Sequence, residues 1–569
     1  MAEGISVSEI DMHQGALSCW RCLAFSFLMT AGFLVAIAGC GGGGGGNSGG
    51  GSTQLIIPTL TFATIPPQTY GDPPFTVSAT SASNGAVIYT VTSGPASVSG
   101  NTVTLTGAGT IALSASQAAS GDYAATTATT SIVVSGDKEW TCEFGCIGGY
   151  ATGLYGTIGV AGSGTPPGRF YTVGWTDNSG NLWLFGGGDA IGFNLNDLWE
   201  FSPSTQKWTW VTGNTEDFNG TAGPNGTIGS TGVYGTLGTP APGNTPGARN
   251  GSVGWTDSSN NFWLFGGSTY VGMINDLWKF SPSIQEWAWM GGSNTASTAV
   301  GTGVYGTLGV ASAGNIPGGR GQSVSWTDKS GDFWLFGGWV NGGNMNDLWE
   351  YSPATNEWTW MSGSKTINAT GIYGTLGIAT AGNSPGARYG AVSWTDNDGN
   401  LWLFGGYGLD SNGSAGYLND LWEFGATNNE WAWVSGSSTV NATGIYGALG
   451  IAASSNVPGA RMYSVGWTDS LGDIWLFSGT ECSTSGNACE QFNDLWKFNP
   501  STKEWTWSSG SSNGNASSVY GNPGTPAPGN VPGGRYGAVR MPEDHNGNLW
   551  LFGGVTTNGY PNDLWSYQP

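Results

Sequence analysis

The chain has 569 residues, enough for more than one domain, and it contains 101 glycines and 30 tryptophans. So many aromatic residues exclude a mainly disordered protein, because disordered segments bury too little apolar surface to fold. The formal net charge of −22 makes nucleic acid and anionic membrane surfaces unfavourable partners.

The first 39 residues have the features of an export signal. Residues 23–38 are apolar and run into Ile37-Ala38-Gly39-Cys40. This sequence resembles the lipobox of bacterial lipoproteins, which implies that residues 1–39 are removed and that Cys40 is lipidated. The resemblance also implies attachment to the outer membrane or cell surface, or otherwise a periplasmic or extracellular location. An uncleaved transmembrane anchor is the alternative. Three acidic residues precede Met12, which is unusual for a signal, so translation is expected to start at Met12 rather than at Met1.

Two segments of different composition follow the predicted signal. Residues 40–53 are mostly glycine and predict a flexible tether. Residues 54–136 lack tryptophan and are rich in Thr, Ser, Ala and Val, with alternating runs at 87–91 and 102–105. Such runs predict a small β-sandwich. The segment resembles bacterial immunoglobulin-like modules, which implies a spacer or an adhesive unit.

Residues 137–569 contain one pattern that recurs six times. Each unit has four short runs of aromatic and β-branched residues, separated by Gly, Asn, Asp, Ser or Pro. In the first unit the runs are 171–176, 182–185, 197–201 and 208–211. They predict four antiparallel strands, named A to D here. A period of about 70 residues with four strands per unit indicates a β-propeller.

Fixed residues within the unit resemble the kelch family. A Gly-Gly pair closes strand B in five units, as at Gly186-Gly187, and the fifth unit has Ser478-Gly479 instead. An aromatic residue lies on strand C and a tryptophan on strand D, as at Trp199 and Trp208. The resemblance implies an all-β, six-bladed kelch-type β-propeller preceded by the sandwich.

The sixth unit ends without a strand D. Residues around Trp140 match those around Trp505 in the fifth unit and precede the first strand A. We therefore expect an N-terminal strand at Trp140 to complete the sixth blade beside Trp565, because closure removes exposed sheet edges.

Ligand recognition is expected at the end of the propeller that carries the D–A and B–C links. These links are long and variable, and variable loops on a rigid scaffold commonly bind ligands. Aromatic residues outside the repeated core suit stacking on a sugar or holding a peptide there, with packing between loops as the alternative. They are Trp339, Tyr407, Tyr417, Tyr270, Phe193 and Tyr560.

Six arginines occupy one repeat position at the start of strand A. They are Arg169, Arg249, Arg320, Arg388, Arg461 and Arg535. A ring of guanidinium groups at a channel mouth would bind carboxylates or acidic peptides. Alternatively, each arginine pairs with the aspartate before strand C of its own unit. Identical repetition favours this packing role.

The cysteines and the acidic A–B turns are the candidate ligands for a metal ion. Cys142 with Cys146, and Cys482 with Cys489, are close pairs that predict two disulfides in an exported protein. Zinc is the alternative, but His545 is the one histidine outside the leader. The A–B turn at 396–400 resembles the start of a calcium loop but lacks its later glutamate, so a plain hairpin turn and no metal are expected.

The chemistry of known propeller enzymes does not transfer to this chain. Galactose oxidase has a similar architecture, and its family uses two copper-binding histidines, which His545 alone cannot supply. A histidine-based triad is excluded on the same ground. The carboxylates of Asp189, Asp410, Glu481 and Glu490 leave a glycan-active hydrolase or lyase as an alternative. We therefore predict a monomeric, cofactor-free binding protein for carbohydrate or protein, with a purely structural surface scaffold as the other alternative.

Overall fold

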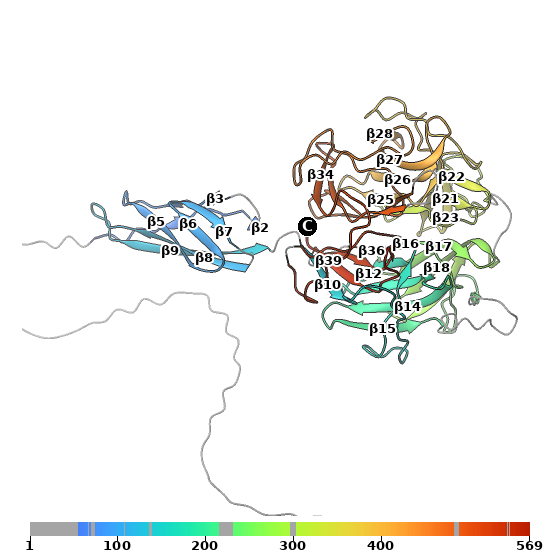
Figure 1. Ribbon diagram of the computed structural model, residues 1–569, viewed down its shortest axis with the longest axis horizontal. Coiled ribbons are helices and arrows are strands. Elements are labelled where there is room, and N and C mark those ends of the chain that lie inside the picture. Colours follow the sequence, from blue (N-terminus) through green and yellow to red (C-terminus); the bar gives the residue numbers. More distant parts are fainter. Residues whose placement is uncertain are drawn as a thin grey trace, which may run out of the picture.

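The computed structural model of the chain describes residues 55–66, 68–69, 74–106, 109–135, 139–214, 231–295, 303–482, 489–527, 529–542, 544 and 547–569. Every regular element in these ranges is a β-strand (Figure 1). The predicted signal, Cys40 and the Gly-rich tether lie outside the described residues.

The N-terminal module packs short strands around one small core. Its sheets have the orders β2-β9-β8-β5, β3-β7-β6 and β1-β4. The strands are β1 (Thr61–Phe62), β2 (Gln68–Thr69), β3 (Phe75–Thr76), β4 (Ala79–Thr80), β5 (Val87–Ser93), β6 (Ala96–Ser99), β7 (Thr102–Leu105), β8 (Gly109–Gln117) and β9 (Thr126–Ser135). Val77, Val103, Ile111, Leu113 and Val134 form the buried centre. Alternation of apolar and polar residues along β7 places Val103 and Leu105 on the same, inward face.

The repeated region forms six antiparallel sheets, numbered 1 to 6 in chain order. Sheet 1 contains β11 (Arg169–Phe170), β12 (Val173–Thr176), β13 (Leu182–Asp189), β14 (Asn194–Ser202) and β15 (Lys207–Thr212). Sheet 2 contains β16 (Val253–Thr256), β17 (Phe262–Thr269), β18 (Gly272–Ser281) and β19 (Glu286–Gly291). Sheet 3 contains β20 (Val324–Thr327), β21 (Phe333–Val340), β22 (Gly343–Ser352) and β23 (Glu357–Ser362).

The remaining three sheets repeat this order with small additions. Sheet 4 contains β24 (Arg388–Tyr389), β25 (Val392–Thr395), β26 (Leu401–Leu409), β27 (Ala415–Phe424) and β28 (Trp431–Ser435). Sheet 5 contains β29 (Val465–Thr468), β30 (Ile474–Phe477), β33 (Leu495–Asn499) and β34 (Glu504–Ser509), with β31 (Thr480–Cys482) and β32 (Cys489–Gln491) paired beside it. Sheet 6 contains β10 (Trp140–Phe144), β36 (Val539–Met541), β37 (Leu549–Phe552) and β39 (Leu564–Tyr567), with β35 (Arg535–Tyr536) and β38 (Val555–Thr556) paired beside it.

Several strands extend beyond their predicted bounds. The predicted strand B at 182–185 is the first half of β13, which continues to Asp189, and strand C begins earlier, at Asn194. The predicted strand A is interrupted, because Tyr171 has a positive φ of 52° and separates β11 from β12. In sheets 1 to 4 most of each long B–C link is therefore strand, and the B and C strands form extended hairpins.

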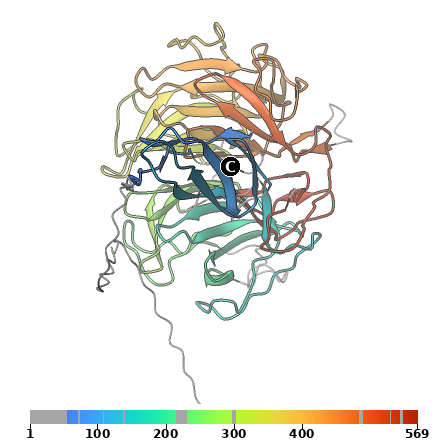
Figure 2. The same ribbon diagram turned by 90° about the vertical axis from the view of Figure 1, so that its left-hand side faces the viewer.

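The sheets pack side by side through aromatic cores. Each buried cluster combines residues of two consecutive sheets, and one cluster joins sheet 6 to sheet 1 through Phe552, Leu564, Trp199 and Trp208. The innermost strands contact one another in the order β12, β16, β20, β25, β29, β36 and back to β12. In Figure 2 the colours accordingly run around the assembly from teal through green, yellow and orange to red. All-β composition with four-stranded antiparallel sheets is the architecture of a β-propeller.

The N-terminal strand lies beside the C-terminal one. Trp140 is opposite Tyr567, and Cys142 is opposite Trp565, in the antiparallel pairing of β10 with β39. Sheet 6 is thus assembled from both ends of the repeated region, as the match between Trp140 and Trp505 predicts.

Candidate functional site

The six repeated arginines are buried in ion pairs. Each guanidinium donates two hydrogen bonds to the repeated aspartate of its own sheet, which lies within strand C in sheets 1 to 4 and directly before it in sheets 5 and 6; the shorter N···O distances are 2.6 to 2.8 Å. The pairs are Arg169–Asp197, Arg249–Asp276, Arg320–Asp347, Arg388–Asp420, Arg461–Asp494 and Arg535–Asp563, with side chains at most 1% exposed. Burial opposes the charge of Arg388, but Asp420 outweighs it and raises the pKa of the arginine. The anion-binding alternative is wrong for this ring, because the guanidinium groups are inaccessible and already paired.

Each of these aspartates has two further partners that the sequence pattern alone did not reveal. In sheet 4, Tyr373 Oη donates to Asp420 Oδ2 at 2.6 Å, and Trp422 Nε1 donates to the same oxygen at 2.7 Å. The same bonds recur in every sheet. The tyrosine comes from the Tyr-Gly motif of the preceding D–A link, so each link is fastened to the sheet that follows. The regular repetition of Tyr-Gly was the available signal.

Only some of the six aromatic candidates are free to meet a ligand. Tyr270 is 68% exposed and Trp339 is 41% exposed. Tyr417 is buried at 8% and lies against Tyr407, with ring centroids 5.3 Å apart. Tyr560 contacts Phe170 and Tyr150, and Phe193 is half-buried. The loop-packing alternative therefore holds for Tyr417, whereas Trp339 and Tyr270 present ring surface to solvent.

A cluster of tyrosines lies around the axis at the end of the B–C hairpins. It consists of Tyr171, Tyr389, Tyr407, Tyr417, Tyr463 and Tyr536, called the tyrosine cluster below. Consecutive ring centroids are 4.5 to 6.5 Å apart. Five of these rings are half-buried, and burial raises the pKa of Tyr389 to about 12. Sequence analysis missed four members, although the variable positions directly after the repeated arginine pointed to them.

One ring of backbone hydrogen bonds holds this end of the axis together. The third residue of each strand A region, counted from the arginine, donates its N–H to the carbonyl of its counterpart in the preceding sheet. The N···O distances are 2.6 to 3.3 Å around the closed circle of Tyr171, Gly251, Gln322, Gly390, Tyr463 and Gly537. All six residues have φ between 52° and 65°. Large residues and glycines alternate around the circle.

The large side chains of this circle meet at the axis. Tyr463 Oη donates to Gln322 Oε1 at 2.6 Å, and the rings of Tyr171 and Tyr463 are 4.5 Å apart. These residues belong to sheets 1, 3 and 5, so their contacts cross the centre. The glycines make room for them: a Cβ on Gly390 would lie 2.7 Å from the Tyr463 ring. Tyr171, Gln322 and Tyr463 are called the plug below.

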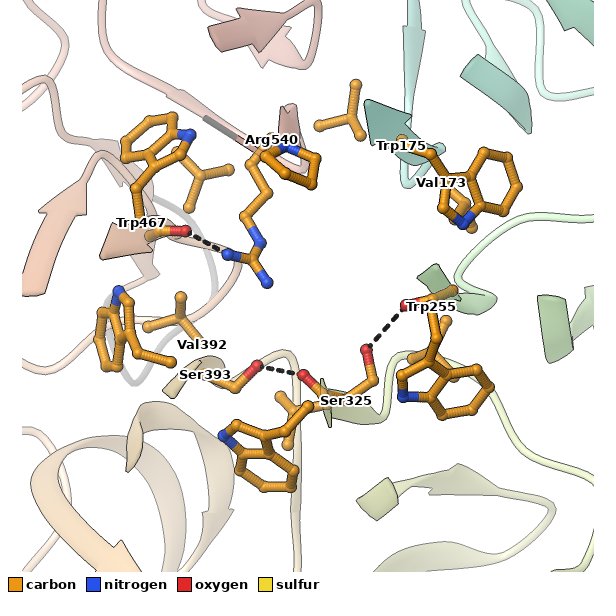
Figure 3. A pocket seen from close by; sticks show the side chains of 18 of the residues that line it. Val173, Trp175, Trp255, Ser325, Val392, Ser393, Trp467 and Arg540 are labelled. Carbon is orange, nitrogen blue, oxygen red and sulfur yellow. Dashed lines mark hydrogen bonds between the residues drawn. The ribbon is translucent and has the colours of Figure 1, made fainter. Parts of the chain in front are cut away.

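Beyond the plug, a central channel of about 580 Å³ runs between the innermost strands to the end that carries the A–B turns. Gly254, Ser325, Ser393 and Thr468 are among its lining residues, and the wall is neutral apart from one side chain. Among the described lining residues, Arg540 alone is charged (Figure 3). Burial lowers the pKa of Arg540 to about 10.

The A–B turns are plain hairpin turns built on an aspartate. In sheet 4, Asp396 Oδ1 accepts the N–H groups of Asp398 and Asn400, and Oδ2 accepts Trp402 Nε1 at 2.8 Å. Both carboxylate oxygens are thus engaged by the turn itself. In sheet 3 an aspartate replaces the asparagine, and carboxylate oxygens of Asp328, Asp332 and Glu350 lie within 4.8 Å of one another. Burial and the two aspartates raise the pKa of Glu350 to about 7.

Two of the four candidate catalytic carboxylates are parts of turns. Asp189 Oδ1 accepts the N–H groups of Ile191 and Phe193, and Asp410 Oδ1 does the same for Asn412 and Ser414. Their positions are explained by hairpin geometry. Glu481 and Glu490 lie opposite each other in β31 and β32, and burial raises the pKa of Glu481.

The four cysteines of the repeated region are joined as the expected close pairs, Cys142–Cys146 and Cys482–Cys489. The first disulfide joins Cys142 of β10, which is paired with Trp565, to Cys146 just after that strand, and the second links β31 to β32. Within the described part of the chain, no helix is long and apolar enough to cross a membrane.

Comparison with known proteins gives a partial match. No protein-family model matches the chain. The chain is similar to Leucine-zipper-like transcriptional regulator 1 of Mus musculus, Pongo abelii and Homo sapiens, with 28% identity over 229 residues in each case. The match covers 40% of this chain and spans 20% of the relatives. These relatives are kelch-repeat proteins, and this distant similarity agrees with the kelch-like repeat and the all-β, propeller-like sheets.

Proposed function

We propose that this chain is a surface-attached binding protein whose repeated region is a six-bladed kelch-type β-propeller. Six consecutive sheets, their circular contacts and the pairing of β10 with β39 support one closed ring. The similarity to a kelch-repeat protein supports an interaction role of the kind that rigid propellers serve.

We base the assignment of a binding surface on the tyrosine cluster. The proposal is that the end of the repeated region with the B–C and D–A links binds a carbohydrate or a protein. Tyrosine supplies a large, rigid contact surface together with a hydroxyl, and it loses little conformational entropy on binding. Half-buried rings around the axis form a shared surface, and exposed Trp339 and Tyr270 lie on hairpins of the same end. The mutual contacts of the rings fix their orientations before a ligand arrives, which lowers the cost of binding.

Surface attachment rests on the leader and on the segments that follow it. Residues 1–39 would direct export, lipidated Cys40 would hold the chain to the membrane, and residues 40–53 with an Ig-like module at 54–136 would space the propeller from it. In a Gram-negative host, labelled palmitate should be incorporated into the wild type and not into Cys40→Ser. Equal labelling of both chains would contradict the anchor and leave the ligand proposal untouched.

Ligand binding is tested by presenting the full chain to a glycan array and a peptide array. We expect one array to yield a ligand, and we expect Tyr389→Ala and Trp339→Ala to weaken its binding by about 1–3 kcal/mol, as central aromatic contacts do. Leu471→Ala is the matched control, since Leu471 is 83% exposed in an A–B turn at the other end. Undiminished affinity of both aromatic variants would place the ligand elsewhere, and silence of both arrays would favour a structural scaffold.

A further inference from the structure

We propose that the central channel is a second binding site, specific for a small oxyanion such as a carboxylate, with Arg540 as the residue that holds it. None of the tyrosines of the cluster lines this channel, and the site does not depend on the function proposed above.

Arg540 departs from its repeat position. The equivalent residues on the other innermost strands are Gly174, Gly254, Ser325, Ser393 and Gly466, all of which are small. Ser393 Oγ donates to the carbonyl of Ser325 in the preceding sheet at 3.0 Å, and Ser325 Oγ donates likewise to Gly254 at 3.4 Å. At two of these five positions a serine thus bonds to the preceding sheet, and a guanidinium is not needed for such a contact.

Among the described residues, the guanidinium of Arg540 has one hydrogen-bond acceptor. Its Nη1 donates to the carbonyl of Gly466 at 2.9 Å, and Figure 3 shows the group reaching from the wall toward the middle of the channel. A guanidinium has five N–H donors, so most of its donor capacity faces the channel. Among the described residues, no carboxylate forms an ion pair with Arg540, in contrast to the six buried arginines of the repeat.

The positive charge of Arg540 is not neutralised by any carboxylate among the described residues. Surrounding protein atoms lower the pKa of Arg540 to about 10, whereas paired Arg388 and Arg535 have raised pKa values. Arg540 is half-buried, and partial desolvation of a cation without an acidic partner is unfavourable, so an anion bound beside it would offset that cost. A carboxylate matches the planar fork of the free donors better than a spherical ion does.

The shape of the channel suits a small ligand. About 580 Å³ exceeds the volume of a single water many times over, and the plug residues Tyr463 and Gln322 are hydrogen-bonded to each other at one end of the axis. In this proposal the ligand enters from the end of the A–B turns, where Thr256, Thr327, Thr395 and Thr468 line the channel. Ser325 and Ser393 are committed as donors to carbonyls, so the wall presents acceptor oxygens that suit the hydroxyl groups of a hydroxylated acid.

The test is calorimetric titration of the full chain with acetate, phosphate and galacturonate at low ionic strength. We expect binding of at least one of them, weakened by at least about 10-fold in Arg540→Gln, because the charge-assisted bonds are lost. Lys329→Gln is the matched control, since Lys329 is an exposed cation in an A–B turn at the same end, and it should bind like the wild type. Tyr389→Ala should also bind normally, which separates this site from the tyrosine cluster. No binding of any probe, or equal binding by Arg540→Gln, overturns the proposal.

A second measurement keeps the proposal testable if Arg540→Gln does not fold. Wild-type crystals soaked in sodium bromide should show anomalous density in the channel beside Arg540. Arg540→Lys, which keeps the charge but loses the fork, should bind acetate more weakly than the wild type without losing it. Bromide density confined to other places, or unchanged acetate affinity in Arg540→Lys, would count against a guanidinium-specific site.

Discussion

At the scale of single residues, the fold depends on the buried aspartate that pairs with the repeated arginine in each sheet. Asp420 is fully buried, yet its carboxylate accepts hydrogen bonds from Arg388, Tyr373 and Trp422. A buried charge is tolerated only when it is paired and hydrogen-bonded, and these partners come from three separate segments of the chain. Each aspartate therefore connects a D–A link, strand A and strand C within one sheet.

Asp420→Asn should destabilise the protein by about 3–5 kcal/mol, because it leaves the buried guanidinium of Arg388 without its counter-charge. Urea unfolding followed by tryptophan fluorescence measures the loss. Asp398→Asn, an exposed residue of the A–B turn in the same sheet, is the control and should change stability little. Similar stabilities of the two variants would mean that the ion pair does not hold the sheet.

Glu350 should make stability depend on pH in one direction. Its pKa is raised in the folded protein from 4.5 to about 7, first by burial and then by Asp332 and Asp328. The folded state thus favours the protonated acid, so the contribution of Glu350 is complete below about pH 4.5 and is lost as pH rises to about 7. Glu350→Gln should remove this loss and be more stable than the wild type at pH 8.

Thermal unfolding of Glu350→Gln and the wild type between pH 4.5 and 8 checks this expectation through the difference between their Tm values. Glu200→Gln is the matched control, because Asn181 stands there in place of Asp332, and Glu200 has one acidic neighbour, Asp177. Its effect should have the same sign and be smaller. A difference between wild type and Glu350→Gln that does not change with pH would contradict the assigned cause.

At the scale of elements, strand A is shaped by one residue with positive φ. That residue ends the short pairing of β11 or β24 with its B strand and turns its N–H toward the preceding sheet. Tyrosine and glutamine rarely adopt such a conformation, which costs roughly 1–2 kcal/mol for a residue with a Cβ. Repetition in all six sheets indicates that the ring of hydrogen bonds and the plug offset that cost.

Gly390→Ala should destabilise the protein by about 1–3 kcal/mol. Its φ of 64° disfavours a side chain, and an added Cβ would lie 2.7 Å from the ring of Tyr463. Gly382→Ala is the control, since nothing lies within 4 Å of a Cβ added there. Chemical denaturation of both variants makes the comparison. Equal stability of the two variants would show that the ring of Tyr463 can move aside without loss of stability.

At the scale of the whole molecule, neighbouring sheets share every core of the repeated region. Each cluster draws residues from two sheets, so removal of one sheet would expose half of two cores. Closure also leaves no innermost strand without neighbours on both sides. The circle is closed inside sheet 6 by the hydrogen-bonded pairing of β10, which precedes sheet 1 in the chain, with β39, the last strand.

Trp140→Ala tests that closure. Trp140 is 2% exposed and contacts Phe477 and Tyr567, with ring centroids 4.8 and 5.0 Å away. Loss of so large a buried side chain should lower the free energy of unfolding by about 3–5 kcal/mol. It should also weaken the pairing of β10 with β39, so that the backbone edge of β39 is exposed more often. Ile147→Ala is the control, because Ile147 is 92% exposed a few residues further on. Unfolding midpoints in guanidinium and light scattering measure the two effects; a wild-type midpoint for Trp140→Ala would argue that β10 is dispensable.

The repeat by itself determined the four-stranded units, the pairing of the Trp140 strand with the last strand, and the preference for Arg–Asp pairs, because identical residues at a fixed period must fill identical environments. It could not place the tyrosine cluster, the plug or the channel. Those depend on residues such as Tyr171, Gln322 and Arg540, which differ between repeats and are far apart in sequence. Only packing around a common axis brings them together, since contacts across that axis are set by the geometry of all six sheets and not by any local pattern.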